Sequence, residues 1–311
     1  MKNFTRWAIY IIVGLVGFIT FLYFSFPYDV LKESIAVETT NATGMAVSIG
    51  DLGPSFPLGI EIENTKLGTS EGNEIQIPYA SVQVSVLPLL WAHIDVDVEI
   101  EDRSQGTLDL SLGLSLFDLL KGSRMILPSS VEIEADKFLF GDLAEFGVKM
   151  FAASPGTSLF LKPILEKMGI DGKLKAEVDL SLNVSDFSLS TGTVSFDLKD
   201  TVVQFDESMQ IPSQKFETAI LKASLQNGTA TIDKNSRFRT KDLDIAFEGK
   251  VLQKTKIEQS VLDISVNLQL FQELRKQFGF ALNAISGKET EGKLLIKISG
   301  PISPAPKIDL L

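Results

Sequence analysis

A strict alternation of apolar and polar residues most constrains what this chain can fold into. In residues 172–184, GKLKAEVDLSLNV, every second residue from Leu174 to Val184 is apolar and the residues between them are polar or charged. Because successive side chains of a β-strand leave on opposite faces, this segment forms a strand with one apolar and one polar face. The pattern recurs along most of residues 45–311. We therefore expect a mainly β protein with a long, curved, largely antiparallel sheet and a few short helices.

Glycine, proline and asparagine interrupt this alternation and divide the chain into predicted strands. Residues 50–59 contain two prolines and are expected to form a loop, and Pro78 is tolerated only at an edge or a bulge. Asn227 and Gly228, between two alternating runs, predict a tight hairpin. The proline-rich residues 301–311 cannot continue a central strand. The predicted strands are 46–49, 60–67, 75–86, 94–101, 107–116, 131–140, 172–184, 194–198, 202–205, 218–225, 229–232, 243–247, 262–270 and 292–299.

An uncharged apolar segment lies near the N-terminus. Residues 7–26 are long enough to form a helix that crosses about 30 Å of hydrocarbon. Lys2 and Arg6 precede the segment and acidic residues follow it, so the positive-inside rule keeps the N-terminus cytoplasmic. A cleaved signal peptide is the alternative, but the apolar run is longer than a signal-peptide core and no A-x-A-like site follows. We expect residues 1–26 to form a cytoplasmic stub and a transmembrane anchor.

Three further segments have helical rather than strand periodicity. Residues 27–44 place Leu31 and Ile35 on one side of a short juxtamembrane helix, which would cap the end of the sheet or rest on lipid headgroups. Residues 141–169 carry apolar side chains at helical spacing on both sides of a Ser-Pro-Gly hinge, which predicts a helical insert. Residues 271–285 predict one more helix. The large β-rich domain, 45–311, would therefore have few helices of its own.

These helices are too few to cover the apolar face of such a sheet. Burying an apolar side chain stabilises a fold by about 1.5 to 3 kcal/mol, so this face will not stay in water. Two interpretations remain open at this point. The sheet closes on itself as a sandwich, or it curves into a groove that shelters acyl chains. The large aromatic residues of the strands, such as Phe138 and Phe196, suit either interior.

The search for reactive groups is mostly negative. The chain has no cysteine, which excludes disulfides, thiol catalysis and thiolate metal sites, and a net charge of -11 argues against nucleic acid as a partner. His93 is the only histidine. Asp95, Asp97, Glu99 and Glu101 share one strand face and could attract calcium, but their spacing follows from alternation alone, and a solvated face is favoured. We find no nucleophile elbow and no phosphate-binding loop. We therefore predict no catalytic, cofactor-binding or metal residues, and no enzyme.

The two ends of the sequence nevertheless resemble a known family. The anchor followed by FPYDVLKESI, residues 26–35, and VSIGDLGPSFPLGIEIENTKL, residues 47–67, resembles the N-terminal region of the type II secretion system protein N family. The closing GKLLIKISGPISPAPKI, residues 292–308, is similar to the end of that family and to the ends of AsmA-like envelope proteins. These stretches consist of turn and strand residues and contain no active site.

The resemblance implies a single-pass protein of the bacterial inner membrane, with the bulk of the chain in the periplasm. It implies a non-enzymatic accessory component of a type II protein secretion system, with other secretion subunits as partners. The AsmA-like similarity implies instead an envelope protein that binds or transfers lipid, with phospholipid or acyl chains in an apolar groove. Partners most often bind to irregular segments of backbone, so we expect partner contacts at residues 50–59, 141–169 and 301–311.

Overall fold

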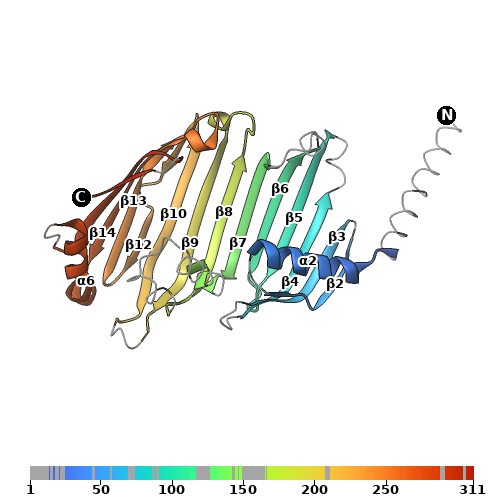
Figure 1. Ribbon diagram of the computed structural model, residues 1–311, viewed down its shortest axis with the longest axis horizontal. Helices are drawn as coiled ribbons and strands as arrows, with labels where there is room; N and C mark the ends of the chain where they lie inside the picture. Colours follow the sequence, from blue (N-terminus) through green and yellow to red (C-terminus); the bar gives the residue numbers. More distant parts are fainter. Residues whose placement is uncertain are drawn as a thin grey trace.

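One antiparallel sheet of sixteen strands makes up most of the molecule (Figure 1). In the computed structural model, neighbours in the sheet are nearly always neighbours in the chain, so the connections are hairpins and short loops. The expectation of a mainly β protein with a long antiparallel sheet and few helices is confirmed. The structure describes residues 14, 17, 21, 25–43, 46–56, 58–68, 74–85, 88, 91–116, 127–141, 144–145, 147–148, 165, 167–206, 211–287, 291–303 and 306–311.

The strands follow the alternation of the sequence closely, and most predicted strands are present within a few residues. Their bounds are β1 Ala46–Ser48, β2 Asp51–Ser55, β3 Gly59–Gly68, β4 Glu74–Ser85, β5 His93–Glu101, β6 Thr107–Ser115, β7 Ser130–Leu139, β8 Gly169–Ser181, β9 Thr191–Gln204, β10 Gln214–Gln226, β11 Thr229–Ile232, β12 Arg237–Thr240, β13 Leu243–Leu252, β14 Val261–Leu270, β15 Lys293–Pro301 and β16 Lys307–Leu310.

Four segments differ from the sequence-based prediction. Residues 50–59 are not simply a loop, because β2 pairs with β3; as an edge strand, β2 tolerates Pro54, which cannot donate a backbone hydrogen bond inward. The two predicted strands 194–198 and 202–205 are replaced by one strand, β9, which spans Thr191–Gln204. The short strand β12 was not predicted, since four residues carry little periodicity. Residues 307–310 add a last edge strand, β16, beyond the proline-rich segment.

Two local predictions about turns and irregularities are confirmed. Asn227 and Gly228 both have positive φ, 50° and 71°, as the tight hairpin between β10 and β11 requires. Pro78 lies in β4 opposite Asn64 of β3, at the one position where the pairing of these strands is interrupted. Asn64 has a φ of 53°, so the proline sits at an irregularity where its missing N–H costs no ladder hydrogen bond.

Two α-helices pack at opposite ends of the sheet (Figure 1). Helix α2, Tyr28–Thr43, makes its main contacts with β1 and β2, so the predicted juxtamembrane helix caps the first strands. The Thr40 hydroxyl accepts a hydrogen bond from the Val47 backbone N–H at 3.3 Å. Helix α6, Gln272–Ser286, packs on β14 and β15. Its Leu274 is buried against Leu270 and Leu294, which explains why a helix follows β14 directly.

The two ends of the sheet lie far apart, so the sheet does not close (Figure 1). The path begins at β1 and β2, which both pair with β3, and ends at β16. The accessible surface is 19572 Å². A folded monomer of this mass exposes roughly 12,800 Å², so this chain exposes about one and a half times that area. The sandwich interpretation is therefore wrong: the sheet is spread out as a single layer.

Two predicted segments fall mostly outside the described residues. Of the predicted anchor, 7–26, the structure describes Gly14, Gly17, Phe21, Ser25 and Phe26. Of the helical insert, 141–169, it describes a few helical positions at the start and the approach to β8. In the described part of the chain, no helix combines the length and the apolarity that crossing a bilayer requires.

Candidate functional site

Continuous apolar rows cross the whole sheet on one face. Paired residues of neighbouring strands point to the same face, so the strand register connects the apolar positions of one strand to those of the next. One row runs through Pro54, Ile60, Val82, Val98, Leu110, Ile133, Val178, Val194, Ala223, Ile232, Gly249, Ile264, Ile298 and Ile308. Every member is apolar or glycine. At about 4.8 Å per strand, this row extends for roughly 60 Å.

A second row of the same kind runs beside the first. Its members are Val84, Val96, Leu112, Val131, Leu180, Gly192, Leu225, Ala230, Val251, Leu262 and Gly300. We call the face that carries both rows the apolar face. Both rows stay continuous across hairpins of different lengths. The register of the strands in these rows is therefore set by the need to keep apolar side chains on one face.

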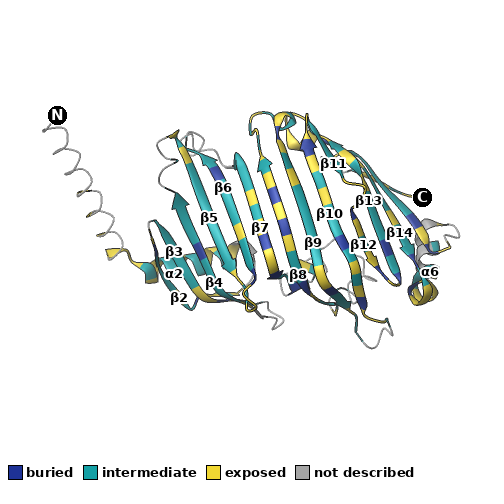
Figure 2. Ribbon diagram, turned by 180° about the vertical axis from the view of Figure 1, so that it is seen from behind, coloured by how far each residue is buried: buried dark blue, intermediate teal, exposed yellow. Residues whose placement is uncertain are grey.

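Most of the apolar face is only half-buried. Figure 2 shows the strands mainly in the colour of intermediate burial, with few fully buried positions. The buried hydrophobic residues of the described chain are scattered over the molecule: Ile49, Ala135, Phe138, Ala176, Val178, Ala219, Leu225, Leu270, Leu274 and Leu294. A sheet face packed under a second layer would bury whole rows instead.

The two helices cover only the ends of the sheet. The main contacts of α2 are with β1 and β2 and those of α6 are with β14 and β15. Between these ends, the described helices leave the apolar rows of β5 to β11 without a principal packing partner. Large contiguous apolar surfaces are typical of sites where proteins bind other apolar molecules.

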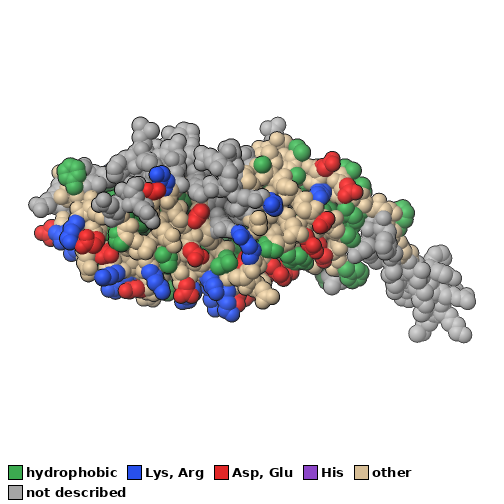
Figure 3. All heavy atoms as spheres, turned by 90° about the horizontal axis from the view of Figure 1, so that it is seen from below, with side chains coloured by type: hydrophobic (Ala, Val, Ile, Leu, Met, Phe, Trp, Pro, Cys, Tyr) green, Lys and Arg blue, Asp and Glu red, His purple; other side chains and the backbone are tan. Residues whose placement is uncertain are grey.

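The opposite face of the sheet is polar and, toward the N-terminal strands, acidic. Figure 3, a view along the strands, shows charged side chains gathered along one long side of the body. A ladder of carboxylates crosses four strands, because Glu99 pairs with Asp109, Asp109 with Glu134, and Glu134 with Glu177. Like charges directly opposite each other destabilise a sheet, so this ladder lowers the stability of the fold.

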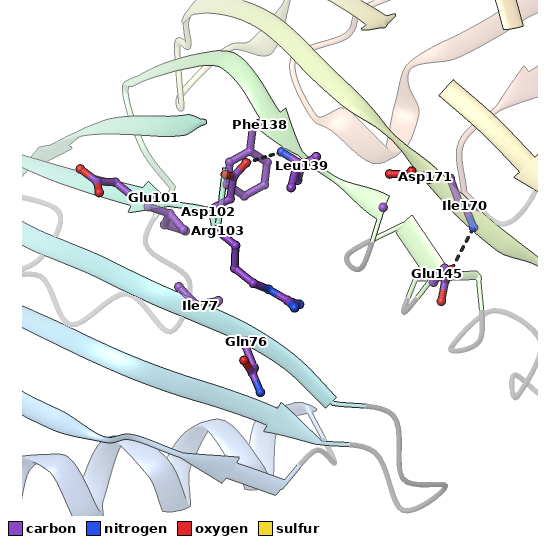
Figure 4. A pocket seen from close by; sticks show the side chains of 12 residues that line it. Gln76, Ile77, Glu101, Asp102, Arg103, Phe138, Leu139, Glu145, Ile170 and Asp171 are labelled. Atoms are coloured by element: carbon purple, nitrogen blue, oxygen red, sulfur yellow. Dashed lines mark hydrogen bonds between the residues drawn. The ribbon is translucent and has the colours of Figure 1, made fainter. Parts of the chain in front are cut away.

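A cavity of about 410 Å³ opens where the apolar face meets the strand ends (Figure 4). Its apolar wall includes Ile100 and Phe138. Both belong to the apolar cluster around Ala135 and Ala176, so the cavity is continuous with the apolar face. Ile77 and Ile170 extend this wall on either side. Its size lies within the range of small-ligand pockets, which is about 300 to 1,000 Å³.

Charged and polar side chains form the rim of this cavity. In Figure 4, Arg103 extends into the cavity from the turn after β5, and Asp171 and Glu145 lie across from it. Glu145 is held in place, because the Ile170 backbone N–H donates to its carboxylate at 3.0 Å. Asp102 lies beside Arg103 on the rim, whereas the Glu101 side chain points away from the guanidinium (Figure 4).

Asp102 fixes the turn from which Arg103 extends. One carboxylate oxygen accepts hydrogen bonds from the backbone N–H groups of Ser104 at 2.6 Å and Gly106 at 3.0 Å, and the other accepts from the backbone N–H of Leu139 in β7. Burial alone would raise the pKa of Asp102. The hydrogen bonds from Leu139, Gly106 and Ser104 outweigh that effect, so its pKa lies below the ordinary value.

A second set of ionic groups lies on the polar face of the C-terminal strands. Arg237 of β12 binds Asp244 of β13 through two parallel hydrogen bonds, one of them 2.6 Å between Nε and Oδ1. The hydrogen bond from Arg237 lowers the pKa of Asp244 against the opposing effect of burial. The pair joins the short strand β12 to the sheet, and we assign it a structural role.

The acidic strand considered as a calcium candidate is part of the polar face. Asp95, Asp97 and Glu99 follow one another along β5, and Asp97 accepts a hydrogen bond from the Ser111 hydroxyl at 2.6 Å. His93 begins the same strand and is exposed. Among the described residues, no three histidine, aspartate or glutamate side chains form a group that could hold a metal ion.

Sequence reasoning missed the cavity and, apart from Glu101, the charged residues that line it. Arg103 lies in a turn, and Asp171 lies near an irregularity between β8 and β9, where periodicity carries no information. Of the three predicted contact segments, only the start of 141–169 reaches this cavity. No family model, no curated protein and no solved structure matches this chain.

We predict that Asp102→Asn destabilises the protein at neutral pH. The amide would present a donor where the carboxylate now accepts from Leu139, and the loss of this partly buried hydrogen bond costs about 1 to 3 kcal/mol. Because the pKa of Asp102 is lowered on folding, its contribution is present above the unfolded pKa, about 3.9, and is lost as the pH falls through the lower folded value.

Urea unfolding of both forms at several pH values measures this difference. The gap in free energy of unfolding should be largest at pH 7 and should shrink below about pH 4. Asp136→Asn is the matched control, since the Asp136 side chain is 61% exposed and should change stability little. A gap that is independent of pH would show that the Asp102 carboxylate charge does not hold the turn.

Proposed function

We propose that this protein is a non-enzymatic, membrane-anchored envelope protein that binds lipid acyl chains on the apolar face of its sheet. The single observation that carries the proposal is that this face is continuous from β2 to β16 while the described helices pack only at its ends. Bilayer lipids are the obvious apolar molecules for a protein that a segment such as 7–26 would tether to a membrane. The similarity of residues 292–308 to AsmA-like proteins supports the same function.

The shape of the face suits acyl chains better than a compact ligand. Its rows are long and unbranched, and aliphatic side chains dominate both of them. A flexible hydrocarbon chain gains contact with such a surface at any point along its length. By contrast, a small rigid ligand needs an enclosed pocket with convergent polar groups. We therefore propose several acyl chains, rather than one small molecule, as the occupants of the apolar face.

Two adjacent residues of β9 provide a test of this function. Val194 belongs to an apolar row, and Thr193 points to the opposite, polar face. Val194→Lys places a charge among bound acyl chains, so we expect the amount of lipid that co-purifies with the full chain to fall at least about tenfold. Thr193→Lys adds the same charge on the polar face and should leave bound lipid unchanged.

Mass spectrometry of protein purified in mild detergent measures the lipid, and circular dichroism checks that both variants remain folded. Equal lipid in the two folded variants would contradict the proposal. So would a wild-type chain that carries no lipid at all.

A second candidate function is an accessory component of a type II protein secretion system in the inner membrane. It is favoured by the stretches that resemble the type II secretion system protein N family and by the position of these stretches in the fold. Residues 47–67 form β1 to β3, and residues 292–308 form β15 and begin β16, so the two stretches build the two edges of the sheet. Edge strands offer unpaired backbone groups to other chains. The ladder of carboxylates adds a charged surface for a basic partner.

We predict that the full chain, tagged and expressed at its natural level, co-isolates with other secretion subunits from its own membranes. Deletion of the gene should then reduce the export of folded proteins across the outer membrane. A deletion strain with normal export, and a tagged chain that brings down no secretion subunit, would contradict this second candidate while leaving lipid binding untouched.

A further inference from the structure

The strand β16 lies at one edge of the sheet, near the C mark in Figure 1. Among the described strands, it pairs only with β15. The backbone groups of Leu311 bind those of Leu295 in both directions, at 2.8 and 3.1 Å, so the register directs the groups of Asp309 and Lys307 inward as well. The N–H and C=O groups of the residues between them, Ile308 and Leu310, therefore point away from β15.

The outward edge of β16 also carries exposed apolar side chains. Ile308 is the last member of the long apolar row, and Leu310 pairs with Ile296, so both lie on the apolar face. Both side chains are exposed. An edge that combines outward backbone groups with exposed apolar side chains is a typical place for another β-strand to pair.

The charges of β16 fit a second copy of the same strand. Antiparallel pairing about a twofold axis at Ile308 places Lys307 of each copy directly opposite Asp309 of the other. Opposite charges at facing positions stabilise an antiparallel pair. Within one chain, Lys307 Nζ already lies 3.0 Å from Asp309 Oδ1. In the pair of copies, each charge would keep this neighbour and gain a second neighbour of opposite sign.

Neighbouring registers do not have this complementarity. An axis at Lys307 or at Asp309 would place two like charges directly opposite each other, which destabilises the pair. An axis between two residues would set Ile308 opposite Asp309 and mix the apolar and polar faces. With the axis at Ile308, Leu310 faces Pro306 of the second copy, and the missing N–H of proline would end the pairing there.

The same register joins the apolar faces of the two copies. The row that ends at Ile308 would continue into the row of the second copy and reach roughly 130 Å at about 4.8 Å per strand. The other edge of the sheet does not offer an equivalent strand, because α2 packs on β1 and β2 and Pro54 lies in β2. Pairing through β16 alone closes after two copies, rather than extending into a filament.

We propose that β16 is a homodimerisation strand, through which two copies of the chain pair antiparallel about Ile308 and form one continuous sheet. The apolar faces of both copies then lie on the same side. Each copy contributes one strand of four residues, so the interface is small and the dimer is reversible and concentration-dependent. This inference does not depend on lipid binding.

Single cysteines test the register in the full chain, which has no natural cysteine. Facing residues that exchange hydrogen bonds have Cα atoms about 5.5 Å apart, which is within disulfide range. Ile308→Cys should therefore form a disulfide-linked dimer under mild oxidation. Leu310→Cys should not, because its two copies would lie roughly 14 Å apart. Phe280→Cys, at a position that is 83% exposed, measures the rate of chance collisions.

Two results of this experiment would overturn the proposal. One is equal cross-linking at positions 308 and 310, which would contradict the register. The other is cross-linking at position 308 that is no faster than at position 280, which would show that the edges do not pair.

Charge reversal tests the pairing independently, by sedimentation of the full chain in mild detergent. Lys307→Asp leaves two acidic residues on β16, and Asp309→Lys leaves two basic ones. Each variant alone should self-associate at least about tenfold more weakly than the wild type. A mixture of the two variants should recover dimers, because each acidic strand then faces a basic one. The ion pair within each chain stays broken in the mixture, so recovery reports contacts between copies.

Lys137→Asp is the matched control for charge reversal. The side chains of Lys137 and Lys307 are both 74% exposed, and Lys137 lies in β7, in the middle of the sheet. This variant should self-associate like the wild type. Loss of dimers in the control would overturn the proposal, as would a mixture of the two reversed variants that stays monomeric. A wild-type chain that is monomeric at the concentration of the cross-linking experiment would overturn it as well.

Discussion

The structure depends on the agreement between strand register and side-chain alternation. Because the side-chain period of a strand is two, a slip of one residue in any pair would exchange the two faces. The registers instead carry one apolar row from Pro54 to Ile308 without a polar member. Burial of apolar area is the main favourable term in folding, and here much of it is obtained between neighbours within one layer. The face is therefore specified in detail, and the described helices leave its middle strands without a principal packing partner.

The two edges of the sheet differ in how they are protected from pairing with other chains. An open sheet leaves edge strands whose backbone groups can pair with other chains. At the first edge, β1 and β2 share β3 as a partner, Pro54 blunts the edge, and α2 packs on both strands. At the other edge, β16 is short and carries Lys307 and Asp309. The N-terminal edge is thus protected by the chain itself, and the C-terminal edge is the more accessible of the two.

The sequence predicted the parts of this fold that follow from periodicity. Alternation identified the long strands, Asn227 and Gly228 identified a hairpin, and residues 28–43 and 271–285 showed helical spacing. It did not distinguish an open layer from a sandwich, because the same aromatic and aliphatic residues suit both interiors. The cavity escaped prediction for a different reason. Arg103 and Asp171 come from distant parts of the chain and line one cavity only because of how the strand ends are placed in space, which a one-dimensional pattern does not record.

The central claim, that acyl chains cover an otherwise open apolar face, can be tested by the reactivity of single cysteines, since the natural chain has none. Ile133→Cys lies in an apolar row of β7, and Glu132→Cys lies beside it on the polar face. The account predicts that a thiol reagent labels position 133 in protein stripped of lipid and that added phospholipid protects it, while position 132 reacts equally in both states. A position 133 that stays unreactive in folded, lipid-free protein would contradict the account, because the face would then be covered by the protein itself.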